Sequence, residues 1–118
     1  MNEIYEISML LDIYGQLLTP NQFECIDLHC NQDLSLGEIA EQLKISRQGV
    51  HDFVKRGKNL LNGYEAKLGL LERFERTKEE LERVQAYLEL IDEVGISKED
   101  LHILTRAKQD LMETINKL

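Results

Sequence analysis

Apolar residues recur along this chain at alternating steps of three and four, which is the period of an amphipathic α-helix. A first helix is predicted from about Glu3 to Leu18, and a second from about Pro20 to Asn31. Thr19 can cap the second helix, whose first position suits proline because the missing N–H has no partner there. The residues of this helix expected to face the core are Phe23, Ile26 and Cys30.

The clearest pattern lies at residues 35–58, SLGEIAEQLKISRQGVHDFVKRGK. It predicts two helices joined by a tight turn. Ser35 is a candidate N-cap, with Glu38 placed to complete a capping box. Ser46 is a candidate cap for the following helix. Many helix-turn-helix units carry glycine at the first turn position, where this chain has Lys44, so the turn requires either a strained lysine or a different geometry.

The second helix of this pair separates into two faces when it is drawn at about 100° per residue. One face is apolar and comprises Val50, Phe53, Val54, Gly57, Leu60 and Leu61. The other carries hydrogen-bond donors and comprises Arg47, Gln48, His51, Lys55 and Lys58. A DNA-binding helix-turn-helix needs this arrangement, because the N-terminal part of its second helix meets base edges in the major groove.

Beyond Lys58 the helical period persists across Gly63 and Gly69, so we expect the helix to continue, straight or kinked, into the next segment. From Leu70 to Val94 the pattern is a heptad, whose a and d positions are Phe74, Thr77, Leu81, Val84, Leu88 and Ile91. Gly95 then ends the helix, and Ser97 caps a last helix that reaches the C-terminus. These two helices form a predicted hairpin.

The fold expected from these elements is all-α, with a four-helix lobe at residues 1–66 and a long helical hairpin at residues 67–118. Two helices alone bury little surface. We therefore expect the hairpin to serve oligomerisation, and a homodimer is the simplest result because two-fold symmetry would present two helix-turn-helix units to two half-sites.

Charge is distributed unevenly along the chain. The net charge is −8, which argues against strong general affinity for nucleic acid. Residues 1–34 contain no Lys or Arg, whereas residues 35–67 hold six basic against four acidic residues, a net of +2. The basic segment therefore coincides with the candidate recognition helix. Its small excess indicates few phosphate contacts and modest affinity for one protomer.

Several other classes of protein are disfavoured. No apolar run approaches the ~20 residues that span a bilayer, and the acidic N-terminus is unlike a signal peptide, so we expect a cytoplasmic protein. Cys25 and Cys30 are expected to be reduced thiols there. Cys25 and His29 have metal-ligand spacing, but no second ligand pair follows, so no metal is expected. Nor do we expect a cofactor or an enzyme, because no catalytic or phosphate-binding motif is present.

Residues 14–58, YGQLLTPNQFECIDLHCNQDLSLGEIAEQLKISRQGVHDFVKRGK, resemble the YlxM family of small bacterial proteins. The specific part is LLT-x-x-Q, DLSL-x-EIAE and SRQ-V, and the match extends to about Leu68. The span is also similar to region 4 of sigma factors, which binds promoter DNA. The resemblance implies a sigma-like helix-turn-helix fold and association with the signal recognition particle pathway. Gly49 stands where sigma-like helices usually carry a polar residue, which removes one possible base contact.

The functional hypothesis is a non-catalytic regulator that binds nucleic acid. The candidate base contacts are Arg47, Gln48 and His51, and the candidate phosphate contacts are Lys44, Lys55, Arg56 and Lys58. The plain alternative for each is a solvated surface side chain. DNA is favoured over RNA because a recognition helix does not fit the narrow major groove of an RNA helix. The alternative function, favoured by the net charge of −8, is a protein-interaction module that docks on a protein of the targeting particle and adjusts its GTPase without binding DNA.

Overall fold

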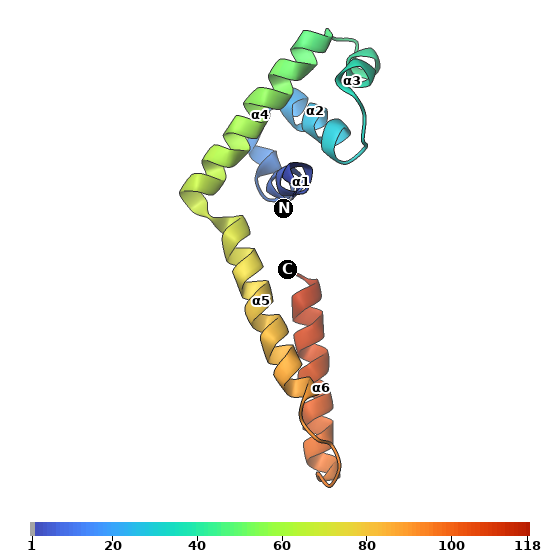
Figure 1. The fold of residues 1–118 in the computed structure, drawn as a ribbon, viewed down its shortest axis with the longest axis vertical. Coiled ribbons are helices and arrows are strands. Elements are labelled where there is room, and N and C mark those ends of the chain that lie inside the picture. The colour runs from blue at the N-terminus through green and yellow to red at the C-terminus, as the bar shows by residue number, and fades with distance from the viewer. Residues whose placement is uncertain (1) are drawn as a thin grey trace. The chain divides into compact units, whose positions relative to one another are not determined.

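A computed structural model describes residues 2–118, in which every regular element is helical, confirming the all-α prediction. The elements are α1 (Glu3–Tyr14), the 3-10 helix η1 (Gly15–Leu17), α2 (Pro20–Cys30), α3 (Leu36–Leu43), α4 (Arg47–Leu68), α5 (Leu70–Glu89) and α6 (Lys98–Asn116) (Figure 1). Of the helices described, none combines the length and the apolar character needed to cross a bilayer.

The chain divides into two compact units, one ending at Leu71 and the other comprising Glu72–Leu118. We call residues 2–71 the lobe and residues 72–118 the hairpin. The division falls after the boundary at residue 66 that the sequence suggested, because Leu71 is only 8% exposed and belongs to the core of the lobe.

Four helices begin at the N-caps that the sequence predicted. In each case the side-chain oxygen of the cap accepts a hydrogen bond from a backbone N–H in the first turn, and the caps are Thr19, Ser35, Ser46 and Ser97. At Ser35 the capping box is complete, because Glu38 accepts a bond from the Ser35 N–H in return at 3.1 Å. These local contacts fix where each helix starts.

The turn between α3 and α4 contains the strained lysine, which is one of the two alternatives left by the sequence. Lys44 adopts the left-handed conformation, with φ 59° and ψ 43°. The Ile45 N–H donates to the Ala40 carbonyl at 3.1 Å. This bond closes a Schellman motif, in which the left-handed residue stops the helix and the next one packs back on it. Ile45 is accordingly half-buried against the core.

The core of the lobe lies where α1, α2 and α4 pack together. Its buried residues are Ile7, Leu10, Leu11, Tyr14, Leu18, Cys25, Ile26, Ile39, Val50, Val54, Leu61 and Leu71. Gly57 permits the closest approach, because a Cβ at this position of α4 would collide with Cδ1 of Ile26 on α2.

That close approach corrects one prediction about α2. Its buried side chains are Cys25 and Ile26, whereas Phe23, expected inward, is 39% exposed. The contact at Gly57 turns Gln22 and Ile26 toward α4, which rotates the buried stripe away from Phe23. The predicted length of the first helix was also wrong, because α1 ends at Tyr14 and the chain continues through η1.

Hydrogen bonds that involve Tyr14 and Glu65 connect α1 and α4 to the start of α5. The buried Tyr14 hydroxyl donates to Oε1 of Glu65 at 2.7 Å and accepts from the Leu70 N–H at 3.2 Å. The Leu71 N–H donates to the same Glu65 oxygen at 3.0 Å. Two backbone donors at the start of α5 are thus satisfied by side chains of α1 and α4.

The expected continuation of the helix beyond Lys58 is confirmed across Gly63 but not across Gly69. Gly69 has φ +61°, a left-handed conformation that ends α4 at Leu68. Gly63 remains helical, and open space surrounds the position where its Cβ would be. The two glycines therefore differ in backbone conformation, which the helical period of their neighbours did not distinguish.

The hairpin packs its two helices along a half-buried seam. The apolar residues of the seam are Leu81, Leu88, Leu104, Leu111 and Ile115. Three of the predicted heptad positions are instead more than 40% exposed, namely Phe74, Val84 and Ile91. The helix also stops at Glu89 and not at Val94, because the chain tightens into a turn in which Leu90 and Ile91 donate three residues back.

Candidate nucleic-acid interface

The second helix of the helix-turn-helix, α4, is anchored by its apolar face. Val50, Val54, Gly57 and Leu61 are buried, as the sequence predicted. The expected apolar face is nevertheless narrower than predicted, because Leu60 is 39% exposed. The helix begins at Arg47, where the Ser46 hydroxyl accepts from the Gly49 N–H at 2.9 Å. Anchoring one side in this way leaves the opposite side of the first three turns free for contact.

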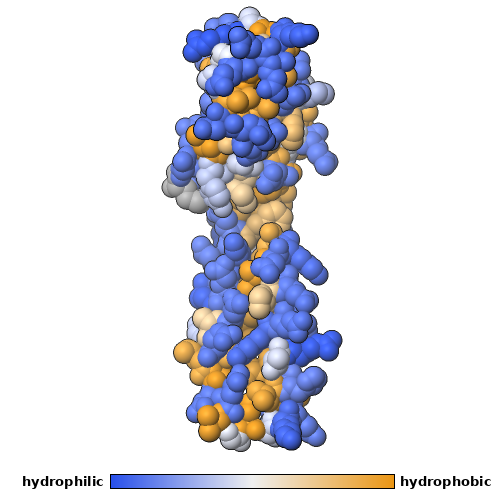
Figure 2. Space-filling model, turned by 90° about the vertical axis from the view of Figure 1, so that its right-hand side faces the viewer, coloured by the Kyte–Doolittle hydropathy of each residue, from blue (hydrophilic) through white to orange (hydrophobic). Residues whose placement is uncertain are grey.

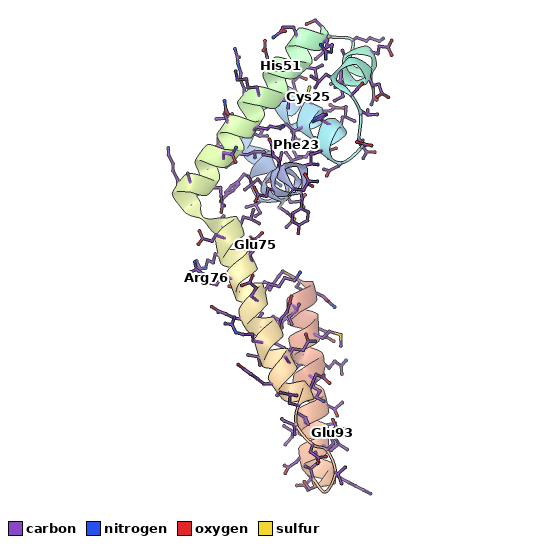
Figure 3. The ribbon with its side chains drawn as sticks, in the orientation of Figure 1. Phe23, Cys25, His51, Glu75, Arg76 and Glu93 are labelled. Atoms are coloured by element: carbon purple, nitrogen blue, oxygen red, sulfur yellow. The ribbon has the colours of Figure 1, made fainter. Side chains whose placement is uncertain are left out.

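The part of α4 that is left uncovered carries most of the predicted site residues. Arg47, Gln48, His51 and Lys55 are exposed, and Lys58 is half-buried. At about 100° per residue these five lie within an arc of roughly 100°. The structure therefore brings them onto one surface, which we call the basic face. Figure 3 shows His51 on α4, on a helix turn near the α3 end of the lobe.

Arg56 and Lys44 lie apart from that face. Arg56 is exposed, but it follows Arg47 by nine residues and so points about half a turn away from it. Lys44 is exposed in the turn that precedes α4, with its backbone held in the left-handed conformation. Neither is grouped with the five side chains of the basic face.

Asp52 borders the basic face and interacts with two of its residues. Gln48 donates from Nε2 to Oδ1 of Asp52 at 3.1 Å. His51 Nδ1 lies 3.6 Å from the same oxygen. Both contacts are solvent-exposed, so they hold the side chains in place only weakly. An arriving base or phosphate would compete with Asp52 for the Gln48 amide and the His51 ring.

A groove of ≈ 290 Å³ lies beside the basic face. It is lined by His29, Leu36, His51, Val54, Lys55 and Lys58. The Nδ1–H of His29 donates to the Leu34 carbonyl at 3.0 Å, which leaves Nε2 as the ring's second polar atom. Lys58 Nζ lies 3.6 Å from Oε1 of Glu3. The groove gathers four nitrogen-bearing side chains around a space large enough for a phosphate group.

His29 is the residue of this groove that the sequence did not indicate as a nucleic-acid contact. Its only signal in the sequence was its spacing from Cys25, which pointed to metal. In the structure Cys25 is fully buried, and burial raises the pKa of its thiol, which disfavours the thiolate that a metal would bind. Within residues 2–118 no three His, Cys, Asp or Glu side chains converge as a metal site would require. Cys25 and Cys30 are both free thiols.

Comparison with known proteins identifies close relatives. Residues 1–101 match the model of the UPF0122 family, described as "Putative helix-turn-helix protein, YlxM / p13 like". A UPF0122 protein of Acetivibrio thermocellus is 47% identical over 115 residues, covering 98% of each chain. A UPF0122 protein of Desulforamulus reducens is 48% identical over 84 residues, covering 71% of this chain and 72% of the relative. One from Clostridium kluyveri is 42% identical over 115 residues, covering 98% and 100%.

Proposed function

This chain belongs to the UPF0122 family of YlxM/p13-like helix-turn-helix proteins, and from that premise we propose that it is a non-catalytic regulatory protein that binds nucleic acid through α4. The observation that carries the proposal is the basic face, in which Arg47 and Gln48 project from the first turn of a helix whose other side is buried. In DNA-binding helix-turn-helix proteins this is the part of the recognition helix that contacts base edges.

The proposed contacts divide by chemistry. Arg47 can pair bidentately with guanine and Gln48 with adenine, and His51 can donate to a neighbouring base. Lys55 and Lys58 would hold phosphates, which position a protein without specifying sequence. Lys44, in the turn before α4, and His29, in the groove, join the phosphate contacts in this proposal. Arg56, which points about half a turn away from Arg47, would reach only a phosphate that flanks the groove.

DNA is the favoured ligand over RNA. α4 presents a rigid helix of suitable diameter, which enters the wide major groove of B-DNA but not the narrow major groove of an RNA helix. The net charge of −8 opposes non-specific binding of nucleic acid to the rest of the surface, so the region around α4 is where binding is favoured. The resemblance to YlxM proteins adds the signal recognition particle pathway as the cellular setting of this proposal.

A homodimer formed through the hairpin is part of the proposal. Phe74 and Val84 on α5, and Ile91 just beyond it, are each more than 40% exposed, and Met112 on α6 is 50% exposed. Pairing of two hairpins would cover such residues and place two lobes around a two-fold axis. Sedimentation measures the mass of the full-length chain at tens of micromolar. A monomeric mass would rule out the homodimer but not nucleic-acid binding by the basic face.

Binding is tested by fluorescence anisotropy with the full chain on duplex DNA and on targeting-particle RNA, each at two salt concentrations. The Arg47→Ala/Gln48→Ala variant should bind a selected DNA sequence at least about 30-fold more weakly, since it removes two bidentate pairs that each contribute ~1–3 kcal/mol of discrimination. The matched control is Arg106→Ala/Gln109→Ala, which removes the same two residue types from exposed positions on α6. Equal affinity of both variants for every DNA and RNA tried would reject the proposal.

Asp52 provides a second test with the opposite sign. Asp52→Asn removes a negative charge beside the proposed phosphate contacts and keeps a hydrogen-bond acceptor for Gln48. We expect affinity for any duplex to rise about two- to fivefold at low salt, and the gain to shrink as salt screens the charge. A change confined to one DNA sequence would show instead that Asp52 orients Gln48 for base contact.

The alternative function remains a protein-interaction module that adjusts the targeting-particle GTPase without binding DNA. The observation that favours it is the acidic character of residues 1–34, which hold six acidic residues and no Lys or Arg. A pull-down of purified particle protein, with and without its RNA, separates the two functions. This alternative would be favoured if the particle protein is pulled down in the absence of its RNA and the anisotropy assay shows no DNA binding.

A further inference from the structure

A second groove lies on the lobe, between η1 and α2. Its volume is ≈ 530 Å³, within the range of pockets that bury a sizeable ligand. It is lined by Gly15, Gln16, Leu18, Pro20, Phe23, Glu24, Asp27 and Leu28. Most of its surface is apolar, and Leu17 beside it is 58% exposed. We call it the acidic groove, because its only charged lining residues are Glu24 and Asp27.

Phe23 is held in place within this groove. A Cβ on Gly15 would come within 2.7 Å of the Phe23 ring, so only glycine lets the ring lie directly against the backbone of η1. Phe23 as a whole is nevertheless 39% exposed. An aromatic side chain that is fixed on one side and open on the other loses little conformational entropy when a second molecule covers it.

The groove faces away from the basic face. On α2, Phe23, Glu24 and Asp27 lie on one side at about 100° per residue. Gln22, which contacts α4 near Gly57, and His29, which lines the phosphate-sized groove, lie on the other. A molecule in the acidic groove would therefore leave the basic face unobstructed.

We propose that the acidic groove binds an amphipathic helical segment of a partner protein, with apolar side chains on the buried side and Lys or Arg at its edges. The apolar floor matches the way such helices insert anchors at i, i+3, i+4 and i+7. Glu24 and Asp27 select positive charge at the rim, and the absence of Lys and Arg from residues 1–34 removes competing repulsion. The partner is thus an apolar and basic helix.

A second copy of this chain fits the groove poorly. Residues 72–118, which hold the exposed apolar side chains of the hairpin, contain twelve acidic against eight basic residues, a net of −4. Like charges would meet at Glu24 and Asp27. The proposal also stands apart from nucleic-acid binding, because it uses the opposite side of α2.

The test uses the full-length protein and a fluorescent model peptide of leucine and lysine, with leucine at i, i+3, i+4 and i+7. Its control peptide carries glutamate in place of lysine. We expect the lysine peptide to bind and to shift the NMR signals of Phe23 and Leu28, and the glutamate peptide not to bind. Glu24→Lys should weaken binding about fivefold and Phe23→Ala about tenfold or more.

The matched control for charge is Glu41→Lys, which reverses an exposed acid on α3 outside the groove. DNA affinity of the Phe23→Ala variant should equal that of the native chain, which separates failure here from failure of the proposed function. Equal peptide binding by Glu24→Lys, Glu41→Lys and the native chain would overturn the proposal. So would peptide-induced shifts confined to the hairpin, or the appearance of a dimer that disappears in Phe23→Ala.

Discussion

The lobe and the hairpin are both built from amphipathic helices, but they bury their apolar faces to very different extents. The lobe contains all twelve buried hydrophobic residues of the described chain. Within residues 72–118 no residue reaches that degree of burial, and the seam is only half-covered. The space-filling view shows the open seam of the hairpin, since hydrophobic residues lie on its surface among hydrophilic ones and gather toward its turn (Figure 2).

The comparison shows that an apolar stripe specifies a helix but not a core. Three helices that enclose a common space exclude water from their contacts, whereas two helices leave both flanks of the seam in solvent. The lobe should therefore have most of the stability of the chain. The hairpin should open more easily until another surface covers it.

The largest expected effect comes from truncating matched leucines in the two units. Leu61→Ala, at a fully buried site, should lower the free energy of unfolding by about 3 kcal/mol because it leaves a cavity. Leu111→Ala, in the half-buried seam, should cost about 1 kcal/mol because solvent can fill the space. Urea denaturation followed by circular dichroism measures both. Equal losses would mean that Leu111 is buried as completely as Leu61, through contact with a partner chain.

A pair of glycines on α4 gives the next effect and tests how tightly the lobe is packed. Gly57→Ala should destabilise by about 1–3 kcal/mol, since the added methyl collides with Ile26. The methyl group added by Gly63→Ala would contact no other atom. This change should stabilise the chain by about 0.5–1 kcal/mol, because alanine lowers the conformational entropy of the unfolded state. Thermal unfolding of the two variants should shift in opposite directions. Two shifts of the same sign would contradict the close approach of α2 and α4.

Tyr14→Phe tests the contact that ties the start of α5 to the lobe. Loss of the hydroxyl bonds to Glu65 and Leu70 should cost about 1–2 kcal/mol. Burial, followed by the Glu65 hydrogen bond, raises the pKa of Tyr14 above its ordinary value of 10.0. Its stabilising contribution is therefore complete below about pH 10 and is lost as pH rises through the raised pKa.

The pH dependence provides the control for that experiment. The free energy of unfolding of the native chain should fall above pH 10, and the fall should be smaller in Tyr14→Phe, which has no phenol to ionise at this site. Parallel declines in the two proteins would assign the alkaline loss to other groups and contradict the role given to Tyr14.

The smallest effect comes from exchanging the residues at two helix ends of similar geometry. Lys44 has φ 59° and ψ 43°, and Gly69 has φ 61° and ψ 28°. Lys44→Gly should stabilise the lobe by up to about 1 kcal/mol, and Gly69→Lys should destabilise by about 1 kcal/mol, because a side chain is strained in this conformation. If Lys44 also holds a phosphate, Lys44→Gly will weaken DNA binding while it raises the melting temperature.

Local rules predicted the fold best where the signal was a side chain beside its own helix. The caps at Thr19, Ser35, Ser46 and Ser97 were predicted correctly because each cap acts on the backbone three residues ahead. The helical period of α4 also indicated its buried face. These features need no knowledge of other segments.

The errors arose where packing between distant segments decides the result. Phe23 was expected inward because helical spacing cannot show that Gly57, more than thirty residues later, draws α4 onto another side of α2. The groove formed with His29 was missed for the same reason, since it joins α2 to α4. In the hairpin, Phe74 and Val84 fit a heptad but remain 43% and 45% exposed, because a heptad pattern does not show whether a second apolar surface covers it.

The bonds from Tyr14 and Glu65 to the first backbone groups of α5 bear on the order of events during synthesis. A helix is costly to nucleate, and a ready-made acceptor pair at its first turn lowers that cost. Both side chains belong to segments that leave the ribosome before α5 does. A folded lobe can therefore nucleate α5 at its N-terminus during synthesis, so that folding proceeds in the same direction as translation.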